Sequence, residues 1–163
     1  MKKIINNNTA VLGMPTYLLV AIVVAGIVIG LFAIAILQSI KNSQTEQIKH
    51  EIEKIITEAE NMFEYADSGT LVTVSVDFTD NLNFIVFGSM PQNGAFKPSD
   101  LTLDEDMNNN YYFVTNDGTI LTYSSNARFS SEDTSKIALF GPGNYDLSLE
   151  LVNVGGKTYV KIY

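Results

Sequence analysis

A run of 22 residues without a charge, at positions 16–37, limits what this chain can fold into more than any other feature. It reads TYLLVAIVVAGIVIGLFAIAIL and contains no Pro, Asn or Gln. A helix that crosses a bilayer needs about 20 mostly apolar residues. A backbone in hydrocarbon must also satisfy its own hydrogen bonds. The run therefore predicts a helix that lies in a membrane or packs among other helices.

Charge divides the chain into two parts. Lys2 and Lys3 precede the apolar run, whereas all 18 acidic residues follow it, the first at Glu46. Because basic residues favour the cytoplasmic side of a membrane, we expect a cytoplasmic N-terminus and an acidic part outside the cell. The net charge of −8 argues against a nucleic-acid partner, since phosphate binding needs a basic surface. The absence of cysteine excludes disulfides, thiolate metal sites and a cysteine nucleophile.

Three interpretations of the apolar helix remain open. It could be a secretory signal, for which Ala33-Ile34-Ala35 offers an A-x-A cleavage site, although such signals usually have only about 7–15 apolar residues. It could be a permanent membrane anchor. It could also enter the membrane first and later pack into the core of a filament. In this last case Gly26, Gly30 and Ala33 share a face that lets another helix approach closely.

Beyond the apolar run, a helical pattern continues with a single apolar face. Its period is close to 3.6 residues, and Glu, Lys and Gln fill the other positions. The apolar positions are Ile48, Ile52, Ile55, Ile56, Ala59, Met62, Phe63 and Ala66. No Pro or Gly separates them from the apolar run, so we expect one helix over residues 15–66, with Asn42-Ser43 as the point where it would kink and Gly69 as its cap. The apolar face requires a partner within the chain.

From Leu71 onward the apolar period changes to two, which is typical of strands. The sequence predicts three hairpins and a short strand at residues 136–140. In the first hairpin the turn at residues 79–81 pairs Phe78 with Leu82 and Val76 with Phe84. The second turns at Asp117-Gly118.

The third hairpin turns at Gly155-Gly156. This turn pairs Leu151 with Val160 and Leu149 with Ile162 on one face, and the same register pairs Glu150 with Lys161 on the other.

The predicted fold class is therefore α+β, with a long N-terminal helix packed on a C-terminal antiparallel sheet of six or seven strands. Four segments follow from this plan. Residues 1–13 form a leader or cytoplasmic tail, residues 14–40 a transmembrane or filament-core helix, residues 41–67 an amphipathic extension, and residues 70–163 an extracellular β-rich domain.

The sequence offers little catalytic chemistry. The single histidine, His50, lies on the amphipathic helix without a nominated nucleophile or acid, and no phosphate-binding, dinucleotide, zinc-protease or nucleophile-elbow motif occurs. We expect no enzymatic activity, no cofactor and no small-molecule substrate.

One metal candidate is present. Asp104, Asp106 and Asn108 follow the D-x-D-x-N spacing of a Ca²⁺ loop. The positions that require Gly and a bidentate Glu in such a loop hold Asn109 and Thr115, so a solvated acidic loop is the competing interpretation.

The segment AVLGMPTYLL at residues 10–19, together with the order of leader, apolar helix, amphipathic extension and β domain, resembles archaeal type IV pilins and archaellin-like proteins. This resemblance implies a non-enzymatic, pilin-like subunit that polymerises with copies of itself, its apolar helices in the filament core and its β domain at the cell surface. It also implies that a leader peptidase cuts between Gly13 and Met14. The family usually carries a basic residue beside the cut, where this chain has Leu12.

The alternative to a filament subunit is a single-pass, membrane-anchored β domain that acts as an envelope or binding module.

Overall fold

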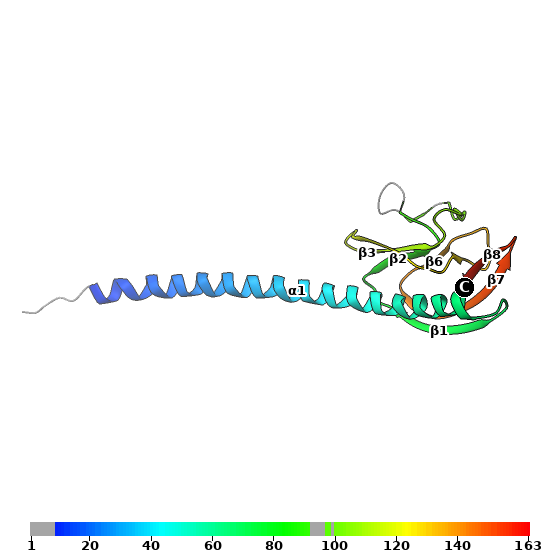
Figure 1. The fold of residues 1–163 in the computed structure, drawn as a ribbon. Helices are drawn as coiled ribbons and strands as arrows, with labels where there is room; N and C mark the ends of the chain where they lie inside the picture. Colours follow the sequence, from blue (N-terminus) through cyan, green and yellow to red (C-terminus); the bar gives the residue numbers. More distant parts are fainter. Residues whose placement is uncertain (1–8, 92–96, 99) are drawn as a thin grey trace, which may run out of the picture. The chain divides into compact units, whose positions relative to one another are not determined.

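The computed structural model describes residues 9–91, 97–98 and 100–163, with side chains from residue 16 onward. The chain is divided into two compact units, Met1–Asn42 and Ser43–Tyr163. One long helix, α1 (Thr9–Tyr65), precedes eight strands (Figure 1).

Helix α1 confirms the expectation of one continuous helix. No break occurs at Asn42-Ser43, and the helix ends one residue before the expected Ala66. It begins at Thr9 rather than at Pro15. Pro15 therefore lies inside the helix, where a proline lacks the N–H for one backbone hydrogen bond and its ring crowds the preceding turn.

The β-rich unit contains two four-stranded sheets rather than the single sheet we expected (Figure 1). The first sheet has the order β1 (Leu71–Phe78), β7 (Gly143–Val154), β8 (Lys157–Ile162) and β5 (Phe129–Ser130). The second has the order β4 (Ile120–Ser124), β3 (Asn110–Thr115), β2 (Leu82–Phe87) and β6 (Ala138–Phe140). The paired strands are antiparallel except β5 and β8, which run parallel.

The first predicted hairpin is wrong. Strand β1 pairs with β7, so that Val76 lies opposite Tyr145, and β2 pairs with β3 and β6. The turn between them, in which the Leu82 N–H donates to the Thr79 carbonyl at 2.9 Å, carries the chain from one sheet to the other. All eight residues of β1 pair with β7, whereas the six-residue β2 could not pair with β1 along its whole length.

The other two hairpins are confirmed. Strands β3 and β4 pair around Asp117-Gly118. Strands β7 and β8 have the predicted register, including Leu151 opposite Val160 and Glu150 opposite Lys161. The Lys161 ammonium also forms an ion pair with the Glu150 carboxylate at 3.0 Å.

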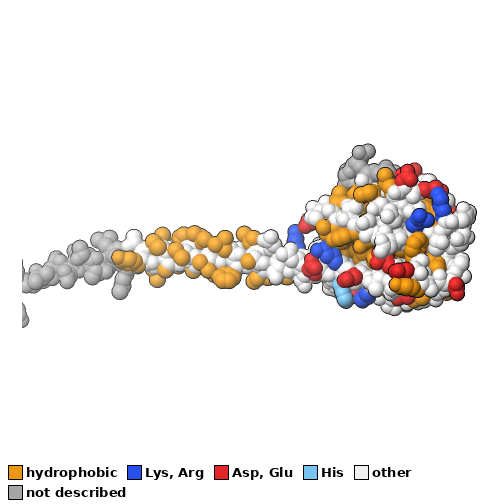
Figure 2. Space-filling model, viewed as in Figure 1, with side chains coloured by type: hydrophobic (Ala, Val, Ile, Leu, Met, Phe, Trp, Pro, Cys, Tyr) orange, Lys and Arg blue, Asp and Glu red, His pale blue; other side chains and the backbone are white. Residues whose placement is uncertain are grey.

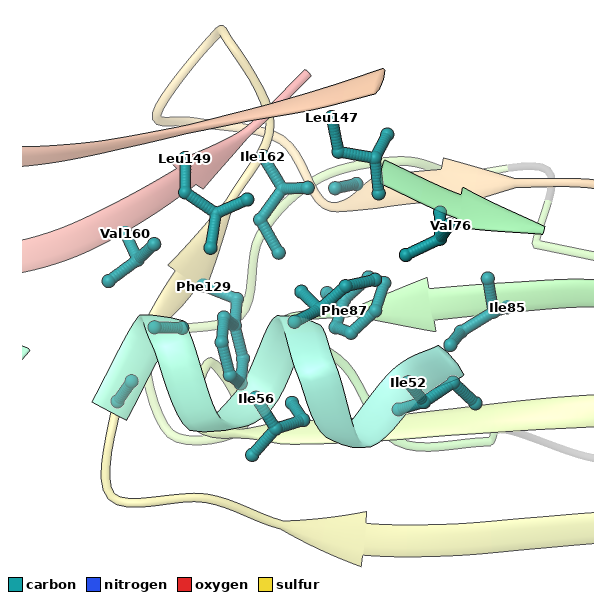
Figure 3. Close-up of a cluster of buried hydrophobic side chains, with 14 of the residues drawn as sticks. Ile52, Ile56, Val76, Ile85, Phe87, Phe129, Leu147, Leu149, Val160 and Ile162 are labelled. Atoms are coloured by element: carbon teal, nitrogen blue, oxygen red, sulfur yellow. The ribbon is translucent and has the colours of Figure 1, made fainter. Parts of the chain in front are cut away.

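The main core lies where the amphipathic part of α1 meets both sheets. Ile52 and Ile56 of the helix are buried with Phe87 of one sheet and Leu149 of the other, and Phe129 lies among them (Figure 3). The buried helix positions are those of the apolar stripe in the sequence. The face of the helix that required a partner therefore finds it in the β region.

The two central strands of the second sheet, β2 and β3, are mostly buried on both faces. Ile85 and Phe87 face the main core, whereas Phe84 and Val86 belong to a smaller cluster with Tyr112. The alternation expected for Leu82, Phe84 and Val86 fails, because a bulge between Leu82 and Phe84 turns Leu82 toward the main core.

Candidate functional site

The first candidate site is the apolar surface of α1. Among the described residues, this is the one helix long and apolar enough to cross a membrane, with a mean hydropathy of 3.1 over its best 18-residue window and none of that window buried. Large apolar side chains between Tyr17 and Ile40 are 43–80 % exposed (Figure 2). Such a surface is compatible with a membrane anchor or a signal sequence.

The predicted packing residues Gly26, Gly30 and Ala33 lie four and three residues apart in this helix, which places them on one face. Apart from the adjacent residues and the nearby helix backbone, a Cβ atom built on Gly26 or Gly30 would meet no atom within 4 Å. The space above both glycines is therefore open to a second helix. Gly13 and Met14, the predicted cleavage site, also lie within α1, but their side chains are outside the described residues.

Two glutamates fix the amphipathic part of α1 to the β region. The Glu60 Oε1 atom accepts hydrogen bonds from the Ser125 hydroxyl (2.7 Å) and the Asn126 N–H (3.0 Å). Glu51, only 8 % exposed, accepts from the Asp77 N–H at 3.1 Å and from the Lys54 ammonium at 2.7 Å. The sequence placed these glutamates only among the polar positions of the helix, because nothing in a helical pattern marks which polar position will meet a strand edge.

Glu51 makes the stability of the β-rich unit depend on pH. Burial raises the pKa of its carboxyl, but the hydrogen bonds from Lys54 and Asp77 outweigh this, so the pKa lies below the ordinary 4.5. A lowered pKa in the folded state stabilises the protein above pH 4.5, and this contribution disappears as the pH falls further. We expect Glu51→Gln to reduce the free energy of unfolding by about 1–2 kcal/mol at neutral pH. The difference from the wild type should shrink below pH 4.5 in denaturant titrations.

Glu46→Gln is the matched control for this prediction. Glu46 pairs with Lys49 at 2.7 Å, but its side chain is 70 % exposed. Exposed pairs contribute about 0–1 kcal/mol, so this variant should unfold almost like the wild type at every pH. Equal losses in both variants would contradict the role of the buried carboxylate.

The second candidate site is a polar hollow of about 420 Å³ in the β-rich unit. Its lining consists of Phe63, Glu105, Asp106, Asn108, Asn109, Ser125, Asn126 and Arg128. It includes two of the three predicted Ca²⁺ ligands, Asp106 and Asn108, but not Asp104. The Oδ1 atom of Asp104 accepts a hydrogen bond from the Asp106 N–H at 3.0 Å.

Sequence reasoning missed most of this lining, because it comes from three segments far apart in the chain. No group of three or more His, Cys, Asp or Glu side chains within the described ranges is arranged to hold a metal. His50 is exposed on α1.

No family model, no curated protein and no solved structure matches this chain.

Proposed function

We propose that this protein is a non-enzymatic structural subunit of an archaeal type IV pilus-like cell-surface filament, which assembles with copies of itself through its apolar N-terminal helix. The observation that supports this most is the exposed apolar surface between Tyr17 and Ile40. Burial of a Val, Leu, Ile or Phe side chain is worth about 1.5–3 kcal/mol, so this surface cannot remain in water. It requires lipid or other helices.

Gly26, Gly30 and Ala33 favour helices as the final environment. In lipid there is little hydrophobic gain when two apolar helices meet, so their association depends on close van der Waals packing. Two open glycines and an alanine on one face allow that packing. The acidic β-rich unit would then face the solvent, while the helices form an uncharged core.

The proposal predicts that Gly30→Leu blocks assembly but not insertion into the membrane. Leucine keeps the segment apolar and improves helix propensity, but it fills the space that a neighbouring helix would occupy. We expect wild-type protein in sheared surface filaments, and about tenfold less or none of the Gly30→Leu variant, which stays in the membrane fraction. Val28→Leu, which places the same leucine at a residue that already has a branched side chain, should assemble normally.

The same preparations test the alternative. A wild-type protein that starts near Met14 in the sheared fraction supports leader cleavage and a filament. If intact wild-type protein stays in the membrane fraction and no filament contains it, the filament proposal is overturned. The chain would then be a single-pass, membrane-anchored β domain. Normal assembly of Gly30→Leu would show that the glycine face is not the packing surface.

A further inference from the structure

The polar hollow is built by three segments that hydrogen bonds hold together. The Ser125 N–H donates to the Asn109 carbonyl at 2.8 Å, and the Phe129 N–H donates to the Asn108 carbonyl at 2.7 Å. Glu60, one turn before Phe63 on α1, accepts from Ser125 and Asn126. The backbone around the hollow is therefore fixed before any ligand arrives, and such preorganisation favours binding.

Several polar groups in this frame are left without a partner. Asn108 is only 4 % exposed, yet within the described part of the chain its side-chain amide has no hydrogen-bond partner. The Asp106 carboxylate, the Asn126 amide and the Arg128 guanidinium also line the hollow without a partner within the described residues, and these three residues are exposed. The polar groups of a nearly buried residue normally find a partner in the protein. The Asn108 amide instead faces the hollow beside three exposed polar groups, and this arrangement points to a ligand.

The charges in the hollow disfavour a simple ion. Arg128 has no ion pair among the described residues, so a cation such as Ca²⁺ would meet its positive charge rather than a cage of oxygens. An anion would meet the free Asp106 carboxylate. Glu105 does not change this balance, because it pairs with Lys157.

The hydrogen-bond donors and acceptors that line the hollow fit a neutral polyhydroxyl compound. Each asparagine amide offers both donors and an acceptor, Arg128 offers donors only, and Asp106 offers acceptors only. A sugar hydroxyl can donate and accept in the same way. The half-buried ring of Phe63 adds an apolar surface for the C–H groups of a pyranose ring. A volume of about 420 Å³ lies within the range of small-molecule sites.

We propose that this hollow binds a neutral sugar residue, with Asp106, Asn108, Asn126 and Arg128 on its hydroxyl groups and Phe63 against its ring. The proposal is independent of the filament function, because an anchored monomer would carry the same hollow.

The test is an NMR titration of the full chain in micelles of a detergent without a sugar headgroup. The probes are the methyl glycosides of glucose, galactose, mannose and N-acetylglucosamine, each added alone, with glycerol and Ca²⁺ as separate arms. We expect at least one glycoside to shift the side-chain amide signals of Asn108 and Asn126 with a Kd of about 1 mM. Glycerol and Ca²⁺ should leave these signals in place.

Two variants with the same loss of charge distinguish the hollow from the general surface. Asp106→Ala should weaken glycoside binding about tenfold, because it removes a charged acceptor. Glu132→Ala, also at an exposed acid but outside the hollow, should bind like the wild type. An unchanged amide spectrum elsewhere would show that both variants fold. Three results would overturn the proposal: no response to any glycoside, a response that Asp106→Ala leaves unchanged, or a response of these amides to Ca²⁺ alone.

Discussion

Replacing Phe87 by alanine is expected to lower the free energy of unfolding of the β-rich unit by about 3–5 kcal/mol. Phe87 is fully buried in the main core (Figure 3). Its ring lies 5.6 Å from that of Phe129, 6.0 Å from that of Tyr111 and 6.3 Å from that of Phe140, measured between centroids. Because Phe129 belongs to the first sheet and Phe87 to the second, the cavity would open where the two sheets meet.

The measurement is denaturant unfolding of the micelle-bound chain, followed by the near-ultraviolet circular dichroism of its 8 tyrosines. Phe87→Leu retains most of the volume and should cost less than half as much as the alanine variant. Tyr65→Ala removes a ring that is 78 % exposed, and it should change stability by no more than about 0.5 kcal/mol. A loss below about 1 kcal/mol for Phe87→Ala would mean that the core collapses around the cavity.

A comparably large effect is expected for Gly88→Ala, which should cost about 2–5 kcal/mol. Gly88 follows β2 with a φ of +90°, a conformation that side chains rarely adopt. A Cβ atom at this position would lie 2.8 Å from the Phe129 carbonyl oxygen and 2.9 Å from Leu103 Cδ1. The Leu103 side chain can move, but the carbonyl belongs to the backbone of β5. Strand β5 and the backbone at Gly88 would therefore have to move apart.

Gly118→Ala separates the cost of the positive φ from the cost of the close contact with β5. Gly118 has a similar φ of +83°, but a Cβ atom there would meet nothing within 4 Å. This variant should show only the backbone strain, about 1–2 kcal/mol. The difference between the two variants in the same unfolding experiment measures the close contact with β5. Equal losses would show that the strand moves away at little cost.

Local patterns predicted those elements whose partners are close in the sequence. The apolar stripe from Ile48 to Met62 identified the buried face of α1, because helical periodicity depends only on neighbouring residues. The register of β7 and β8 followed from the Gly155-Gly156 turn, because both faces of the hairpin agreed with one register. The β3–β4 hairpin followed for a similar reason.

Non-local pairing could not be predicted from the same patterns. Strand β1 has the alternation of a strand and a short turn after it, yet its partner β7 is remote in the sequence. The parallel strand β5 is only two residues long, too short for any periodicity to appear. The bulge after Leu82 shifted the alternation of β2, and only the pairing with β3 reveals it.

The candidate sites, too, could be predicted only where their residues are close together in the sequence. The apolar helix and its glycines could be predicted from one continuous segment. Of the polar hollow, the sequence indicated only Asp106 and Asn108, since their spacing is local. Phe63 joins them through the packing of α1 against the β region, and Arg128 joins them through the hydrogen bond between the Phe129 N–H and the Asn108 carbonyl. The proposal of a neutral ligand rests on Arg128.

The order of the first sheet has a consequence for folding during synthesis. Its two central strands are β7 and β8, and Ser75 of β1 bonds to Asp146 of β7 across 71 residues of chain. At about 5–20 residues per second, β1 waits ~4–14 s for its partner to be made. Until then the apolar face of α1 lacks the side chains of β7 and β8 that share its core. Contacts this distant make folding slow, so the first sheet is completed only after β7 and β8 have been synthesised.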